Sequence, residues 1–322
     1  MSFYKDKNIL ITGAAGITGH AAIKRLLSDG AHVRATQFTS RKINIEHENL
    51  EVVNCDLMEH DDCVRVLQDM DICLNFVAYI RGAKGQTDPK NYLNLVRRNL
   101  TPSINMFDAA VRQGIDRFGF IGSSTMYPNV SYPVKESEAF DSEPHPLYVG
   151  VGEMKRYCEK VIKYFNEISD TKFAVVRTSA IYGPHDAFNE NGHAIPQLIM
   201  KADTGMNPFE VWGDGSQVRD FVYVDDVVDG LLTVIEKDPN ANPYNVATGT
   251  GTTIKELVEV ITDIYGYEPK FNFDTTKPIM IPKRLLDVSK IKNNLGWEAK
   301  HDVRLGLEKT IQWYRDNKWN VN

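Results

Sequence analysis

The chain has 322 residues, 42% of them hydrophobic and 25% charged, with a formal net charge of −6. This length allows one large domain or two fused ones with a sizeable core. The acidic balance, without a basic stripe, argues against binding to nucleic acid over a broad surface. The polar N-terminus lacks a signal-peptide core and no apolar run is long enough to span a membrane, so we expect a cytoplasmic protein.

The four cysteines stand apart from one another. Their spacing forms no CxxC pair and no His/Cys pattern that would hold a metal ion. We therefore expect buried, reduced thiols and no metal site. The residues are Cys55, Cys63, Cys73 and Cys158.

A glycine-rich turn follows the first apolar segment. Asn8–Thr12 is a short apolar run that predicts a buried strand, and His20–Ser28 has apolar residues at helical spacing. The turn between them has the spacing GxxGxxG. Glycines let the backbone approach a pyrophosphate, which the free N–H groups at the helix start then face. The predicted dinucleotide contacts of this turn are Gly13, Gly16, Ile17, Thr18 and Gly19.

The second predicted strand, His32–Phe38, ends without the acidic residue that bonds the adenosine ribose in an NAD-specific site. Gln37 stands there instead and can bond a free 2′-hydroxyl. Arg41 and Lys42, a few residues later, allow a 2′-phosphate. These residues leave NAD and NADP both open.

Strands and helices then alternate along the chain. This order predicts an α/β fold with a Rossmann-like, doubly wound parallel sheet, whose ligands bind beyond the carboxyl ends of the strands. The further predicted strands are Leu50–Cys55, Asp71–Ala78, Asp116–Ser123 and Lys172–Arg177, and the predicted helices are Asp61–Asp69, Asn91–Gly114 and Val151–Ser169.

Six sequence blocks occur in a characteristic order. They are TGAAGITG (Thr12–Gly19), CDL (Cys55–Leu57), SSTMYP (Ser123–Pro128), IYGP (Ile181–Pro184), WGDGSQVRDFVYVDDV (Trp212–Val227) and LGW (Leu295–Trp297). Together they resemble the extended short-chain dehydrogenase/reductase family, the nucleotide-sugar epimerases and dehydratases, over nearly the whole chain. SSTMYP and the block Gly183–Ile199 are most similar to the GDP-sugar enzymes of that family, such as GDP-fucose synthases and GDP-mannose 3,5-epimerases.

The resemblance implies two domains, an NAD(P)-binding Rossmann domain over residues 1–180 and a smaller nucleotide-sugar domain mainly over residues 181–322. Some later segments are expected to return to the first domain. It also implies that Asp56 and Leu57 contact adenine and that Ala78 lies beside the pyrophosphate. Asn99 would support the chain around the fifth strand.

Arg219 and Arg284 match family positions that grip the diphosphate or ribose of the sugar nucleotide. The planar guanidinium suits this task because it binds phosphate oxygens in pairs. Each is alternatively a surface arginine in an ion pair. Trp212 either walls the sugar or fills the core.

The family's active site combines a Ser or Thr with Tyr-x-x-x-Lys on the following helix. Ser123 and Lys155 match the Ser and the Lys, but Val151 stands where the Tyr is expected. Tyr148 is the nearest alternative, although Gly152 would then replace the Lys. The missing phenol leaves three candidates for the base: Ser123 relaying to water, Tyr148 or His193. Loss of a positioned base costs about 10²–10⁴-fold in rate.

Other departures narrow the expected reaction. Ser124 and Thr125 occupy the positions of the acidic pair in 4,6-dehydratases, and Thr125 also replaces the cysteine of the GDP-sugar epimerases. The partner histidine of those epimerases is kept as His193. Ala180 replaces a family Asn, which removes one expected substrate contact. Ser124, Thr125 and His193 remain expected neighbours of the sugar.

These features predict an NAD(P)-dependent oxidoreductase acting at C4 of a GDP-linked sugar, of the GDP-mannose or GDP-heptose type. NAD is favoured on metabolic grounds, and the family likeness points to bacterial capsule and lipopolysaccharide pathways. One alternative is an epimerase that uses Tyr148 as base, and another is a non-catalytic dinucleotide sensor. The family also implies a homodimer or higher homo-oligomer, paired through the helices that begin near Asn99 and Val151.

Overall fold

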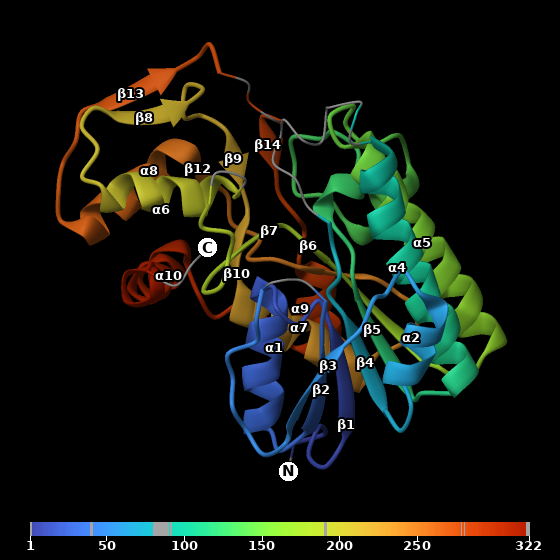
Figure 1. Cartoon of the computed structure of the whole chain (residues 1–322). Coiled ribbons are helices and arrows are strands. Elements are labelled where there is room, and N and C mark those ends of the chain that lie inside the picture. The colour runs from blue at the N-terminus through green and yellow to red at the C-terminus, as the bar shows by residue number, and fades with distance from the viewer. Residues whose placement is uncertain are drawn as a thin grey trace.

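A computed structural model describes residues 2–38, 41–79, 90, 92–189, 192–277, 279 and 281–319. Figure 1 shows a larger lobe built on one sheet and a smaller lobe of short strands and helices, with the chain crossing between them several times. No helix in the described ranges is long and apolar enough to span a membrane.

The larger lobe is built on a seven-stranded sheet whose neighbouring strands are all parallel. This confirms the predicted fold class, and each of the six predicted strands is present. The seventh strand, β11, was not predicted because it has only three residues. In order across the sheet the strands are β11 (Tyr244–Val246), β6 (Lys172–Thr178), β5 (Arg117–Ile121), β4 (Ile72–Asn75), β1 (Asn8–Thr12), β2 (His32–Gln37) and β3 (Leu50–Asn54).

Helices cover both faces of this sheet (Figure 1). One apolar core lies between the sheet and a layer that contains α1 (Ile17–Ser28), α7 (Val224–Lys237) and α9 (Ser289–Leu295). The other lies between the sheet and a layer that contains α2 (His60–Val66), α4 (Tyr92–Gln113) and α5 (Val149–Ile168). The cysteines Cys55, Cys63, Cys73 and Cys158 are free and buried in this second core, as expected.

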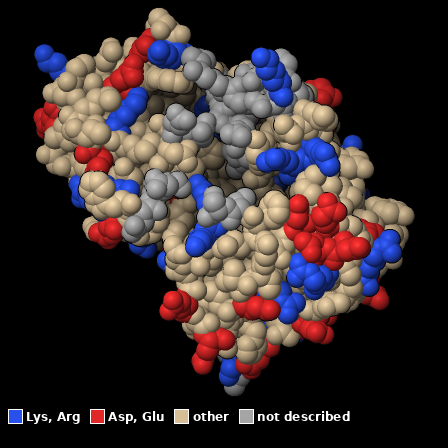
Figure 2. All heavy atoms as spheres, in the orientation of Figure 1, with Lys and Arg blue, Asp and Glu red and all other residues tan. Residues whose placement is uncertain are grey.

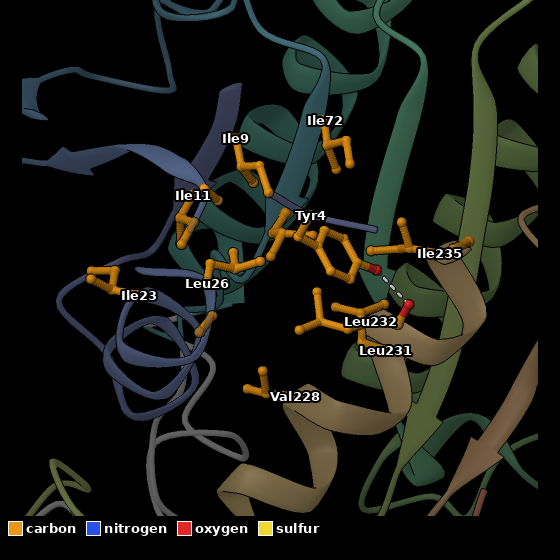
Figure 3. Packing of buried hydrophobic residues seen from close by; sticks show 14 of the residues in the cluster. Tyr4, Ile9, Ile11, Ile23, Leu26, Ile72, Val228, Leu231, Leu232 and Ile235 are labelled. Atoms are coloured by element: carbon orange, nitrogen blue, oxygen red, sulfur yellow. Dashed lines mark hydrogen bonds between the residues drawn. The ribbon is translucent and has the colours of Figure 1, made fainter. Parts of the chain in front are cut away.

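The first core is closed by side chains from distant parts of the chain (Figure 3). Ile9 of β1 and Leu26 of α1 pack in one cluster with Leu231 of α7, all fully buried. Tyr4 lies in the same cluster, and its hydroxyl donates a hydrogen bond to the Leu232 carbonyl at 2.5 Å. Residues after 181 therefore help to build the larger lobe.

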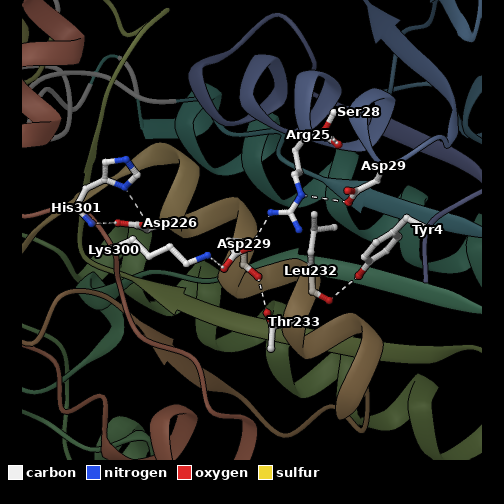
Figure 4. A network of polar contacts seen from close by, with 10 residues as sticks. All are labelled: Tyr4, Arg25, Ser28, Asp29, Asp226, Asp229, Leu232, Thr233, Lys300 and His301. Carbon is white, nitrogen blue, oxygen red and sulfur yellow. Dashed lines mark hydrogen bonds and ion pairs between the residues drawn. The ribbon is translucent and has the colours of Figure 1, made fainter. Parts of the chain in front are cut away.

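A network of polar contacts joins α1, α7 and the segment at residues 300–301 (Figure 4). Arg25 of α1 binds Asp229 of α7 at 2.6 Å, and Lys300 reaches the same carboxylate at 3.4 Å. His301 binds the buried Asp226 at 3.0 Å. The segment before α10 (Val303–Asn317) is thus held against the larger lobe.

The smaller lobe has its own apolar core between short strands and three helices. Two short sheets and one three-stranded sheet with two-residue strands complete it. Its elements are β7 (Ala180–Tyr182) with β10 (Phe221–Tyr223), β8 (Phe209–Trp212) with β13 (Phe271–Asp274), β12 (Thr252–Thr253) with β9 (Val218–Arg219) and β14 (Lys283–Arg284), and the helices α6 (Ala194–Asp203), α8 (Ile254–Tyr265) and α10.

A stack of rings joins the two lobes beside the glycine turn. His20 of α1 is stacked on His185, with ring centroids 3.8 Å apart, and the Trp313 ring of α10 is tilted against His185, with centroids 4.6 Å apart. Burial lowers the pKa of His20 and lowers that of His185 to about 3, and the charges of Lys24 and Arg41 act in the same direction. The stack therefore holds neutral rings.

Replacing His185 with Phe should make the protein less sensitive to acid. The folded-state pKa is depressed, so below about pH 6.5 the unfolded chain binds a proton that the folded chain rejects, and stability falls as the pH drops toward about 3. Phe keeps a flat ring without this proton. Urea unfolding of both proteins between pH 7 and 5 tests this; equal slopes of stability against pH would contradict it.

Candidate active site

The glycine turn after β1 is shaped so that only glycine fits at two of its positions. Gly13 has a φ of +65°, and a Cβ there would lie 2.8 Å from the backbone of Phe76. A Cβ on Gly19 would lie 2.4 Å from the Ala14 Cα, so the start of α1 packs directly on the turn. The turn thus leaves no side chain of its own between backbone and ligand.

The start of α1 fits an anion. Gly16 is its N-cap and offers no side-chain cap, and the first turn contains no acidic residue. The backbone N–H groups in the first turn of the helix, among them those of Ile17 and Thr18, therefore have no side-chain partner at the N-cap. They and the helix dipole suit a pyrophosphate, so this site fits a dinucleotide.

The predicted adenosine contacts lie at the carboxyl ends of β2 and β3. The Gln37 Oε1 accepts a hydrogen bond from the Ile43 amide at 3.1 Å, which orders the following loop. The Asp56 carboxylate accepts from the Met58 amide at 2.9 Å, and Leu57 is buried beside it. Backbone N–H groups therefore hold both the Gln37 side-chain amide and the Asp56 carboxylate in place.

Asn99 holds the segment after β4. Its side-chain oxygen accepts from the Tyr79 N–H and its side-chain nitrogen donates to the Tyr79 carbonyl, each at 3.0 Å. Ala78, the predicted pyrophosphate neighbour, precedes Tyr79 and is exposed. Asn99 therefore fixes the segment that carries Ala78.

Ser123 follows β5 and caps the short helix η2 (Ser124–Met126). Its Oγ accepts hydrogen bonds from the Thr125 amide at 3.2 Å and from the Thr125 hydroxyl at 2.9 Å. With these two bonds accepted, its own O–H is left to donate. Thr125 therefore orients Ser123.

Helix α5 presses against this turn and brings Lys155 to the same strand end. A Cβ on Gly152 would lie 2.7 Å from the Thr125 carbonyl oxygen, so the helix and η2 are in direct contact. The Lys155 Nζ donates to the carbonyl of Ile121, the last residue of β5, at 2.8 Å. Burial lowers the pKa of Lys155. Ser123 and Lys155 thus meet at the carboxyl end of one strand.

A buried ion pair sets the rotation of α5. Glu159, one turn after Lys155, binds Arg177 of β6 through two hydrogen bonds of 2.7 and 3.0 Å. Val151, one turn before Lys155, lines a small cavity together with Lys155, Asn99, Ser103, Met154 and Cys158. Tyr148 is the N-cap residue and lies outside the helix. The register in which Val151 occupies the family's Tyr position stays a prediction.

Arg219 and Arg284 extend from neighbouring positions on β9 and β14. Arg219 donates to the Ile281 carbonyl at 2.6 Å, and Arg284, which is 3% exposed, donates to the Pro128 carbonyl at 2.7 Å. Neither guanidinium has a carboxylate partner among the described residues, and the buried Arg284 Nε has no hydrogen bond. Burial lowers the pKa of both. Two such uncompensated charges predict a bound anion.

The positive charges of Arg219 and Arg284 act on the phenol of Tyr148. Burial raises the pKa of its phenol, and the charges of Arg219 and Arg284 oppose that rise without cancelling it. The phenol is therefore protonated at neutral pH. It suits hydrogen-bond donation better than proton removal.

The remaining predicted sugar neighbours differ in exposure. Trp212 is 43% exposed, with the Lys277 Nζ 5.9 Å above its ring, so it does not fill the core. His193 is exposed and precedes α6. Ser124 follows Ser123 at the start of η2, half-buried. Glu190 and Asn191 of the block Gly183–Ile199 lie outside the described residues.

Asp186 is a buried carboxyl that the sequence motifs did not single out. It is 7% exposed, and its Oδ2 has no hydrogen-bond partner in the described ranges. Its membership of the block Gly183–Ile199 was the available signal. Within the described residues no group of three or more His, Cys, Asp or Glu side chains could hold a metal ion. Figure 2 shows a hollow between the lobes with lysine and arginine side chains on both of its sides.

Comparisons with known proteins agree with this geometry. The model of the NAD dependent epimerase/dehydratase family matches residues 9–247. GDP-L-fucose synthase 1 of Arabidopsis thaliana is 27% identical over 98% of this chain and 95% of its own. GDP-mannose 3,5-epimerase 1 of Oryza sativa subsp. indica is 30% identical over 96% and 82%. The structure of MoeE5 with UDP-glucuronic acid and NAD has a TM-score of 0.81 at 25% identity, covering 96% and 99%.

Proposed function

Because the chain belongs to the NAD-dependent epimerase/dehydratase family, we propose that it is an oxidoreductase acting at C4 of a GDP-linked sugar, of the GDP-mannose or GDP-heptose type. Its cofactor is NAD, as the family and the NAD-bound structural neighbour support. The product of oxidation is a 4-keto sugar nucleotide, and the same site serves the reverse reduction. We place the reaction in the cytoplasm, within capsule or lipopolysaccharide synthesis.

The observation that carries this proposal is a pair of arginines, one half-buried and one buried, that have no carboxylate partner in the described part of the chain. Arg219 and Arg284 suit a diphosphate, because paired guanidinium N–H groups match phosphate oxygens. Backbone carbonyls already hold both side chains, so the ligand meets a prearranged site. The relatives named for GDP-sugars support guanosine as the nucleoside.

Ser123 and Lys155 each have a role in this reaction. The cofactor supplies a hydride acceptor at its nicotinamide when it is bound. Ser123, oriented by Thr125, donates a hydrogen bond to the C4 oxygen of the sugar. Lys155 holds the nicotinamide ribose and adds positive charge near that oxygen. Holding the reacting carbon in place accounts for much of the acceleration.

The side chains at the positions of the dehydratase and epimerase acids favour a single oxidation or reduction at C4 over a rearrangement in several steps. A Thr hydroxyl at Thr125 is too weak an acid for proton exchange beside a ketone, and Ser124 cannot act as a carboxylate. No further group is needed for oxidation beyond a base for the C4 hydroxyl. The chemistry therefore stops at the ketone.

A panel of sugar nucleotides tests this function. Purified protein at high concentration is incubated with NAD and with GDP-, UDP- and dTDP-linked hexoses, while absorbance reports NADH and mass spectrometry reports the sugar. We expect NADH and a 4-keto sugar from GDP-linked substrates. A C4 epimer without net change in NAD indicates an epimerase instead, and no turnover of any sugar indicates a sensor.

Substituting Val151 with Tyr should raise the rate of oxidation. Val151 lies one turn before Lys155 and lines the same small cavity, so a phenol there would stand beside the Lys155 amine. We expect kcat to rise about tenfold or more, toward the 10²–10⁴ that a positioned base contributes. Val151→Phe is the matched control and should not raise it. A Tyr variant no faster than the Phe variant would contradict this register.

We also propose that the protein is a homodimer or higher homo-oligomer through α4 and α5. Large apolar side chains are exposed on these helices, which is unusual for a free surface. Sedimentation equilibrium tests the assembly, with a monomer mass as the contradicting result. The side chains are Leu93 at 77% exposure, Tyr157 at 53%, Tyr164 at 58% and Ile168 at 57%.

A further inference from the structure

We propose that Tyr127 is a positioning residue that holds the Arg284 guanidinium in place for the diphosphate of the sugar nucleotide. This inference rests on the proposed function, because it takes Arg284 as a phosphate ligand. Tyr127 lies four residues after Ser123, directly after η2. Its side chain is fully buried, so we expect it to act through its neighbours and not by touching the ligand.

The backbone at Tyr127 holds the Arg284 guanidinium directly. The Arg284 Nη2 donates to the Tyr127 carbonyl at 3.3 Å, and its Nη1 donates to the Pro128 carbonyl at 2.7 Å. A guanidinium is planar, so bonds to two consecutive carbonyls fix both its position and its tilt. The backbone at residues 127–128 therefore sets the direction in which the other N–H groups of Arg284 point.

The Tyr127 hydroxyl is held on two sides. It donates to the Asn245 Oδ1 at 2.5 Å and accepts from the Arg177 Nη1 at 3.0 Å. Asn245 and Arg177 are buried as well, and burial raises the pKa of the Tyr127 phenol, which keeps its proton for donation. The ring cannot shift without breaking a hydrogen bond in a place that water does not reach, and such a break is costly.

Asn245 extends this fixation to the segment that follows Arg284. The Asn245 Nδ2 donates to the Asp287 carbonyl at 2.9 Å and to the Val134 carbonyl at 3.0 Å. Asp287 is three residues after Arg284. Tyr127 thus reaches this part of the chain twice, through its carbonyl to the guanidinium and through its hydroxyl and Asn245 to the backbone.

Arg177 connects the same hydroxyl to α5. Its guanidinium also donates to the Glu159 carboxylate at 2.7 and 3.0 Å, and Glu159 lies one turn after Lys155. Removing the Tyr127 hydroxyl leaves both of these bonds to Glu159 in place. We therefore expect its loss to disturb Arg284 and to leave Lys155 as it is.

Arg219 offers a comparison within the same site. Its guanidinium donates to the carbonyls of Val218 and Ile281, at 2.8 and 2.6 Å, which belong to its own part of the smaller lobe. In the described part of the chain no hydrogen bond joins it to Tyr127. Tyr127 should therefore affect the phosphate contact of Arg284 but not that of Arg219.

Calorimetric titration of the full-length protein, saturated with NAD, with GDP tests the inference. Tyr127→Phe keeps the ring and removes only the hydroxyl. We expect the Kd for GDP and the KM for the GDP-sugar to rise about three- to tenfold, the size of one buried hydrogen bond expressed as a ratio. The Kd for NAD and kcat should stay within about twofold, because the bonds to Glu159 remain. A purely structural role would lower the unfolding temperature without this split.

A double-mutant cycle shows whether Tyr127 acts through Arg284. In an Arg284→Ala background, Tyr127→Phe should no longer change the Kd for GDP, whereas in an Arg219→Ala background it should keep its full effect. A full effect without Arg284 overturns the proposal. If Arg284→Ala does not fold, the single Tyr127→Phe variant and its control still decide.

Tyr244→Phe is the matched control. Tyr244 precedes Asn245 on β11, is buried, and donates its hydroxyl to Asp238 at the end of α7 at 2.5 Å. This variant should lose stability and still bind GDP as wild type does. Wild-type affinity in Tyr127→Phe, or an equal loss in both variants, overturns the proposal. Wild type that does not bind GDP, or Arg219→Ala and Arg284→Ala that both bind it normally, defeats the proposed function instead.

Discussion

Lys155→Ala is expected to abolish most of the activity and to weaken cofactor binding together. Lys155 is the one residue to which both the nicotinamide ribose and the charge at the C4 oxygen are assigned, and its amine is buried at the end of β5. We expect kcat/KM to fall by about 10²–10⁴-fold and the Kd for NAD to rise severalfold. Steady-state kinetics and calorimetric titration with NAD measure the two effects.

The control for this change lies on the same helix. Lys160 is exposed and points toward the Phe140 ring, 5.3 Å from its centroid. Lys160→Ala makes the same substitution away from β5 and should leave both quantities within twofold. Equal losses in the two variants would show that alanine weakens α5 as a whole, and the role assigned to Lys155 would be wrong.

Arg219→Ala should separate sugar-nucleotide binding from cofactor binding. The half-buried Arg219 has no carboxylate partner among the described residues and is held by the Ile281 carbonyl, so its removal takes away a prearranged phosphate ligand. We expect the Kd for GDP and the KM for the GDP-sugar to rise about 30-fold or more, equivalent to roughly 2 kcal/mol. The Kd for NAD should not change.

Arg304 provides the comparison within the smaller lobe. It is an exposed arginine on α10 that pairs with Asp263 at 2.6 Å. Arg304→Ala should bind GDP as wild type does. If GDP binds Arg219→Ala as tightly as wild type, the diphosphate lies elsewhere and the proposed position of the sugar fails with it.

The larger lobe could be predicted from sequence because its signals are local. Short apolar runs such as Asn8–Thr12 alternate with helical spacing, and β1 has the predicted bounds. Helix α5 begins at Val149, two residues before the expected start, which leaves Tyr148 at its N-cap. The strands β9, β12 and β14 have two residues each, so tertiary contacts and not local pattern produce them.

The candidate site also has features that local sequence predicts and features that depend on tertiary contacts. Ser123 and Lys155 could be predicted because each belongs to a local motif, one directly after a strand and the other on a helix. The structure brings both to the end of β5. The unpaired state of Arg284 was not readable, since it depends on which carbonyls of the other lobe it meets. Nor was the burial of Asp186, which follows from a loop that folds over the start of α1 through the His185–His20 stack.

Deuterium at C4 of the sugar gives the most direct test of the central claim, which is hydride transfer from that carbon to NAD. Protein, NAD and a GDP-hexose labelled with deuterium at C4 are mixed in comparable amounts, and mass spectrometry follows both nucleotides. We predict that NADH gains the deuterium while the sugar becomes an unlabelled 4-keto product. Unlabelled NADH, or a sugar epimer that keeps its deuterium, would contradict the account.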